Sequence, residues 1–102
     1  MTELPTDVSV EPVWLVEATY APDGAEARAP YRAEHLAGAA ARIRAGTYAM
    51  AGAYADVSAS VFLVRAGSAE AATAIVSDDV YLRNGVWVEV RARAFGWVVV
   101  SD

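Results

Sequence analysis

The residues of this sequence that are best suited to chemistry are one histidine, His35, and a pair of aspartates, Asp78 and Asp79. An imidazole changes its protonation state near neutral pH, so it can act as a base or an acid. A carboxylate on its other ring nitrogen would fix the tautomer. The alternative is a partly exposed helix histidine without a role. Asp79 has two compatible interpretations: it caps a short helical turn that starts at Val80, or it faces His35.

Several other side chains could bind a substrate beside such a pair. Arg32 lies one helical turn before His35 and could hold an anionic group, or it could be a solvated charge. Trp87 and Tyr48 could form the wall of an apolar pocket, with an aromatic core or an interface as the alternative. Four hydroxyl groups could donate hydrogen bonds in a pocket, although hydroxyls at strand ends are often turn residues; they belong to Tyr20, Ser58, Ser60 and Tyr81.

Composition excludes several classes of function. The chain has no cysteine, which removes disulfides, cysteine-based zinc sites and thiol nucleophiles. One histidine and scattered acids lack metal-ligand spacing, and no Gly-x-Ser-x-Gly motif is present, so we expect no metal, no cofactor and no serine hydrolase. A net charge of -5 without a basic block argues against nucleic acid and anionic membranes. No apolar run approaches a membrane span and no signal peptide is evident, so a cytoplasmic location is expected.

Secondary-structure signals predict the elements that position these residues. Residues 1–12 carry charges and prolines without an apolar period and are expected to form a flexible N-terminal tail, which leaves 13–102 as a single domain. In the domain we predict strands over 13–20, 47–54, 61–65 and 86–95, helices over 29–45 and 69–76, and a helical turn over 80–84. This order indicates a ferredoxin-like α+β fold, an antiparallel sheet with two helices on one face.

The faces of these elements predict how the domain packs. Leu36, Ala40 and Ile43 form a narrow stripe expected to pack the first helix on the sheet. Strand alternation puts four large side chains on the uncovered face of the sheet: Tyr48, Met50, Trp87 and Phe95. Such a patch usually marks a contact, and a homodimer joined sheet to sheet would cover it. The apolar run 95–100 is expected to pair with the neighbouring subunit.

Short motifs along most of the domain are shared with a known family. They are Tyr20-Ala21-Pro22-Asp23, Arg32-Ala33-Glu34-His35-Leu36, Gly46, Ala51-Gly52-Ala53, Ser60, Ser68-Ala69-Glu70-Ala71-Ala72, Asp79-Val80-Tyr81 and Gly85-Val86-Trp87. With these motifs, the segment from about Trp14 to Phe95 resembles the YCII-related (YciI-like) proteins. One departure is that Val80 stands where the family has a proline.

The resemblance implies a dimeric α+β barrel, in which two ferredoxin-like protomers place their sheets face to face. It also implies a site that pairs His35 with Asp79. Most members are uncharacterised, but related proteins include a dehydrochlorinase of chlorinated hydroxyquinols, and the wider superfamily includes muconolactone isomerases and cofactor-free monooxygenases. We therefore expect a cofactor-free acid–base enzyme of lyase, isomerase or hydrolase type acting on a small cyclic or aromatic metabolite. The alternative is a non-catalytic small-molecule-binding or accessory dimer.

Overall fold

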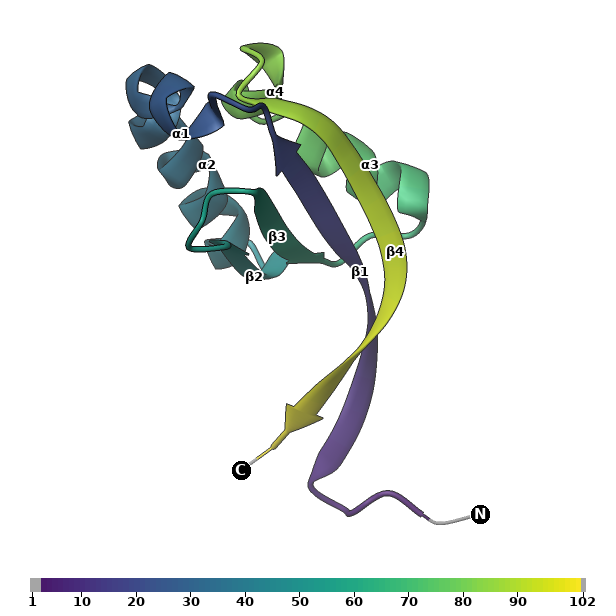
Figure 1. Cartoon of the computed structure of the whole chain (residues 1–102). Coiled ribbons are helices and arrows are strands. Elements are labelled where there is room, and N and C mark those ends of the chain that lie inside the picture. Colours follow the sequence, from purple (N-terminus) through teal and green to yellow (C-terminus); the bar gives the residue numbers. More distant parts are fainter. Residues whose placement is uncertain (1–2, 102) are drawn as a thin grey trace.

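The computed structural model describes residues 3–101 as a four-stranded antiparallel sheet with helices packed on it (Figure 1). The strand order is β2-β3-β1-β4. In chain order the elements are β1 (Val8–Tyr20), α1 (Gly24–Ala27), a 3₁₀ turn (Ala29–Tyr31), α2 (Arg32–Arg44), β2 (Tyr48–Ala53), β3 (Ala59–Val64), α3 (Ala69–Ser77), α4 (Val80–Arg83) and β4 (Trp87–Val100). The α+β prediction is thus confirmed, with α1 as an additional element where a turn was expected. No helix within residues 3–101 has the length and apolar character needed to cross a membrane.

The predicted helix boundaries follow from local signals that the structure confirms. Gly46 and Gly85 both have positive φ, of 82° and 72°, which glycine adopts without strain at the ends of α2 and α4. Ser68 caps α3, where its side chain accepts a hydrogen bond from the backbone N–H of Ala71 at 3.0 Å.

The core lies between one face of the sheet and helices α2, α3 and α4. On β1, Val16 and Ala18 point to this side, and their partners on β3 are Phe62 and Ser60. Apart from Tyr81 of α4, the helices contribute small side chains to the same cluster: Ala39 from α2, Ala72 and Val76 from α3, and Val80 from α4. Small residues on the helices let them approach the sheet closely, which brings α2 and α4 side by side at one end.

The segment 8–12, expected to belong to a flexible tail, is instead the first part of β1. It pairs with the end of β4 from Val8 opposite Val100 to Pro12 opposite Gly96. One edge of 95–100 is therefore paired within the chain, with β1, whereas pairing of the outer edge of β4 with a neighbouring subunit stays a prediction. Figure 1 shows the two strands continuing past the helices as a two-stranded arm that carries both termini. Hydrogen bonds to residues 8–12 thus satisfy the backbone groups on one edge of residues 96–100.

Two β-bulges change which face carries the large aromatic side chains. In β2, one extra residue stands between Tyr48 and Met50, whose partners on β3 are consecutive. In β4, one extra residue stands between Trp87 and Glu89, whose partners on β1 are consecutive. Each extra residue reverses the alternation. Tyr48 and Trp87 are therefore buried in the core, which corrects their predicted position on the uncovered face. Met50 and Phe95 are 42% and 41% exposed, as that prediction required.

Candidate functional site

His35 and Asp79 meet at the end of the core where α2 and α4 lie together. The Nδ1 atom of His35 is 2.8 Å from Oδ2 of Asp79, and both side chains are buried. The other carboxylate oxygen accepts the backbone N–H of Tyr81 at 2.8 Å, so Asp79 is also the N-cap of α4. Both interpretations of Asp79 thus hold in one geometry. Val80, in place of the family's proline, leaves this contact intact.

Two aromatic rings hold the imidazole in place. The ring of Tyr81 is stacked on that of His35, with centroids 3.9 Å apart and planes 10° apart. Trp87 packs edge-on, with its ring centroid 5.5 Å from that of His35. With Nδ1 engaged by Asp79, these contacts fix the ring orientation and leave Nε2 without a protein hydrogen-bond partner in the described part of the chain.

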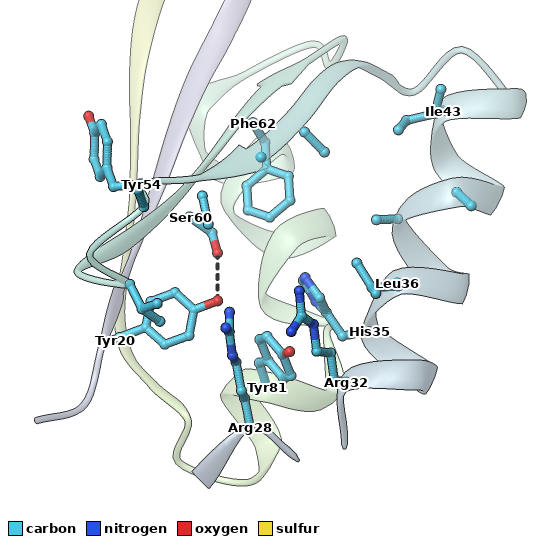
Figure 2. A pocket seen from close by; sticks show the side chains of 17 residues that line it. Tyr20, Arg28, Arg32, His35, Leu36, Ile43, Tyr54, Ser60, Phe62 and Tyr81 are labelled. Carbon is cyan, nitrogen blue, oxygen red and sulfur yellow. Dashed lines mark hydrogen bonds between the residues drawn. The ribbon is translucent and has the colours of Figure 1, made fainter. Parts of the chain in front are cut away.

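A cavity of about 490 Å³ lies next to His35, between α2 and the β2–β3 hairpin (Figure 2). The α2 stripe that was expected to pack on the sheet lines this cavity instead. Leu36 and Ile43 are 52% and 46% exposed, and Ala40 lies between them. The prediction that this stripe packs on the sheet is therefore wrong: the three residues lie on one face of α2 as expected, but that face borders the cavity. Ala-rich walls leave room for a ligand.

Three of the four hydroxyl candidates reach the same cavity, whereas Ser58 does not line it and lies in the hairpin turn, where its backbone N–H donates to Asp56. Ser60 Oγ donates to Tyr20 Oη at 3.2 Å, which leaves the Tyr20 hydroxyl hydrogen free to point elsewhere. Tyr81 also lines the cavity. Burial raises the pKa of the Tyr81 hydroxyl, and this outweighs the lowering by Arg28 and Arg32, so the group stays a hydrogen-bond donor at neutral pH.

Arginine lines the cavity at two positions, of which only Arg32 was predicted from the sequence. Arg32 lines the cavity as predicted, and Arg28 lines it as well. Arg28 follows the short helix α1, which was expected to be a turn. Its spacing of four residues from Arg32 was the available signal, since residues four apart share a helix face.

The two aromatic wall candidates do not line the cavity. Trp87 and Tyr48 are both buried in the core, where Trp87 supports the imidazole from below the site. Neither the Tyr48 hydroxyl nor the Trp87 indole N–H has a hydrogen-bond partner among residues 3–101. Burial raises the pKa of Tyr48 to about 12, so its hydroxyl does not ionise at working pH. Trp87 was predicted to contact a substrate directly, but it does not line this cavity.

The hairpin turn that borders the cavity carries backbone strain. Val57 has φ of 58°, a left-handed conformation that β-branched residues rarely adopt, and it lines the cavity. Strain of this kind persists where the surrounding structure requires it, often at functional sites. Within residues 3–101, no three His, Asp or Glu side chains gather in an arrangement that could hold a metal ion.

Comparison with known proteins assigns the chain to a family. A search of curated proteins gave no match. The family model of the YCII-related domain matches residues 13–96, which include every candidate residue of the site. Because this match spans most of the chain and agrees with the motifs around His35 and Asp79, the chain belongs to the YCII-related family.

Proposed function

We propose that this protein is a cofactor-free enzyme that moves protons on a small cyclic or aromatic molecule, as a lyase, isomerase or hydrolase. The observation that carries the proposal is the contact between His35 and Asp79, 2.8 Å long, at the edge of a cavity of about 490 Å³. A cavity of this volume falls within the range of roughly 300 to 1,000 Å³ typical of small-molecule sites.

The chemistry follows from the tautomer that Asp79 selects. Its carboxylate accepts the Nδ1–H of His35, so in the neutral ring Nε2 carries the lone pair and acts as the base. In a lyase or isomerase, Nε2 takes a proton from the substrate, and the electron pair of the broken bond either moves into the substrate's conjugated system or expels a leaving group. In a hydrolase, Nε2 takes a proton from a water molecule, whose oxygen forms a bond to the substrate as the leaving group departs. The imidazolium, stabilised by Asp79, then returns the proton to another substrate atom, to the leaving group or to solvent.

Residues around the cavity provide the other functions that proton transfer needs. Tyr81 holds the imidazole plane and offers a hydroxyl donor, and Tyr20, linked to Ser60, offers a second. Donors of this kind stabilise negative charge that develops on a substrate oxygen during proton removal. Arg32 supplies positive charge one helical turn from His35.

We also propose that the active form is a homodimer with the dimeric α+β barrel arrangement, built from ferredoxin-like protomers. The strand order β2-β3-β1-β4, with helices packed on the Val16 and Ala18 face, supports this. On the opposite face, Met50 and Phe95 remain partly exposed beside the charges of Glu89 and Arg91. Burying such a patch against a second copy would gain hydrophobic free energy.

Hydrogen exchange on candidate substrates tests the proton transfer without knowledge of the product. Small cyclic compounds that raise the melting temperature would be incubated with the protein in heavy water, and carbon-bound deuterium would be followed by NMR. His35→Gln is expected to slow exchange by about 10² to 10⁴ fold, the usual contribution of a positioned base. Asp78→Asn, which changes an exposed carboxylate beside the site, is the control and should exchange like the wild type. Equal exchange by His35→Gln and wild type would overturn the proposal.

A further inference from the structure

Two arginines in the cavity have no acidic partner. Arg28 and Arg32 both line it, and within residues 3–101 neither lies within ion-pair distance of a carboxylate. Four of the other arginines are paired: Arg42 with Asp78, Arg65 with Glu11, Arg83 with Glu34, and Arg91 with Glu89. In a chain with a net charge of -5, acidic partners are plentiful. Arg44 and Arg93 also lack an acidic partner, but neither lines the cavity, so Arg28 and Arg32 are the two unpaired arginines of the described residues that a ligand in the cavity can reach.

The two arginines enter the same cavity as hydroxyl donors. Both line it together with Tyr20 and Tyr81. Figure 2 shows the Arg28 and Arg32 side chains reaching toward the part of the cavity between Tyr20 and His35. Like charges four residues apart repel when nothing lies between them. An anion held by both guanidinium groups would remove that repulsion and gain charge-assisted hydrogen bonds.

The cavity wall changes from charged to apolar along α2. Arg32 lies at the start of the helix and His35 one turn on, and the wall continues through Ala39 to Ile43. At a rise of about 1.5 Å per residue, Ile43 lies roughly 16 Å from Arg32 along the helix axis. On the facing strands the wall is made by Ala51 and Phe62. The cavity thus has a cationic end, an apolar end, and the imidazole close to the cationic end.

We propose that the ligand is a small ring-bearing carboxylic acid, with its carboxylate between Arg28 and Arg32 and its ring against the apolar wall. This inference rests on the proposed function, since it makes the acid the substrate of His35. A planar carboxylate matches the fork of a guanidinium group, and binding it there brings the adjoining carbons next to His35 Nε2. The carboxylate thus positions the molecule, and proton transfer takes place on its ring or on the carbon that joins ring and carboxylate.

Matched acid and amide pairs test the charge requirement directly. Benzoate with benzamide, phenylacetate with phenylacetamide, and cyclohexanecarboxylate with cyclohexanecarboxamide differ in charge but hardly in shape. Binding would be followed by NMR titration of the backbone amides at low salt. We expect at least one acid to bind about tenfold or more tightly than its amide, with the largest shifts at the start of α2, and the preference to weaken as salt screens the charges.

Variants then assign the preference to the two arginines. Arg28→Gln combined with Arg32→Gln is expected to bind acid and amide equally, whereas Arg32→Lys keeps the charge and should retain part of the preference. Arg44→Gln is the matched control, because Arg44 is an exposed residue of the same helix that does not line the cavity. Equal binding of acid and amide by the wild type, an unchanged preference in the double glutamine variant, or no binding of any acid at millimolar concentration would overturn the inference.

The His35→Asn variant separates this inference from the proposed function. It is expected to keep the acid preference and to lose deuterium exchange. Retained exchange together with an arginine-dependent preference would remove the catalytic proposal and leave a carboxylate-binding protein. Loss of exchange in His35→Asn without any acid preference would leave the base in place and show that its substrate is not a carboxylate.

Discussion

At the residue scale, Asp79 performs two tasks with two oxygens, and two substitutions separate them. Asp79→Ala removes both the cap of α4 and the partner of His35, so it should lower the free energy of unfolding by about 1 kcal/mol and abolish exchange. Asp79→Asn retains an oxygen for the Tyr81 N–H, so its stability should stay close to wild type. However, its NH₂ group would donate to His35 Nδ1 and move the proton to Nε2, leaving no base toward the cavity.

Chemical unfolding and deuterium exchange, measured on the same samples, check this pair. Asp79→Asn should lose about 10² to 10⁴ fold in exchange at nearly unchanged stability. Asp78→Asn, which keeps both contacts of Asp79, should match the wild type in exchange. Full exchange by Asp79→Asn would show that the carboxylate caps the helix and does not orient the imidazole.

The residue types of the dyad could be predicted from the sequence, but not every side-chain position could. His35 and Asp79 stand out because they are the one histidine and a carboxylate at a capping position. Trp87 was misplaced because a bulge adds one residue to β4 and turns this ring into the core. Local composition carries no mark of that bulge, since its cause is the fit between strands distant in sequence. Arg28 was not predicted because the turn that carries α1 lies against the Val86 carbonyl, which is a tertiary contact that local sequence does not show.

At the element scale, the boundaries of the helices and of β2 and β3 could be predicted to within a few residues from caps and glycines, whereas the extent of β1 and β4 could not. Their outer halves carry Pro12 and Gly96, which argue against strand when taken alone. Pairing along the whole length of both strands overrides those local preferences. A Cβ at Gly96 would lie 2.9 Å from Val10 Cγ1 on the paired strand, so a side chain at this position would require Val10 to move.

The approach of α1 to β1 gives a prediction for a matched pair of glycines. A Cβ at Gly24 would lie 2.7 Å from Tyr20 Cδ2 and 3.1 Å from the Val86 carbonyl oxygen. Gly24→Ala should therefore cost about 1 to 3 kcal/mol, because the turn carrying Arg28 must move away from the sheet. Gly38→Ala, on α2, would meet only Arg42 Nη1 at 3.6 Å and should gain about 0.5 to 1 kcal/mol from helix propensity.

Thermal or chemical unfolding should show a lower free energy of unfolding for Gly24→Ala and a higher one for Gly38→Ala, each relative to the wild type. Acid binding adds a second readout, because Gly24→Ala should weaken it by displacing Arg28 whereas Gly38→Ala should not. Equal stability of the two variants would mean that α1 does not pack against Tyr20 as closely as these distances require.

At the scale of the whole molecule, the arm formed by the outer halves of β1 and β4 is tied to the domain by Arg65. This side chain donates to both carboxylate oxygens of Glu11, at 2.6 and 3.2 Å, and to the Gly46 carbonyl oxygen at 2.8 Å. Its guanidinium carbon also lies 5.6 Å from the ring centroid of Trp97. The hydrogen bonds from Arg65 hold the pKa of Glu11 below its ordinary value.

A lowered carboxyl pKa fixes the direction of a pH effect on the arm. The stabilisation is complete above the pKa of an unfolded glutamate and is lost as pH falls through the lower folded value. Below about pH 4, amide protection of the arm should therefore decrease relative to that of β3. Glu11→Gln should show the weaker protection already at neutral pH and a smaller further change, whereas Glu89→Gln, at an exposed pair 3.9 Å apart, should behave like the wild type. If the amide protection of the arm changed neither with pH nor with the Glu11→Gln substitution, the contact between Arg65 and Glu11 would not hold the arm.

The proposed dimer leads to a prediction that involves the whole molecule. Phe95, at the base of the arm, is 41% exposed on the sheet face opposite the helices, where a second copy in the proposed dimer would bury it. Phe95→Glu would place a charge in that contact and should raise the dimer dissociation constant about tenfold or more, measured by sedimentation. Ala37→Glu, an equally drastic change at an exposed position of α2, should leave it unchanged. A wild-type chain that sediments as a monomer at all concentrations would contradict the dimer. The dyad would still be complete in that case, because His35 and Asp79 belong to the same chain.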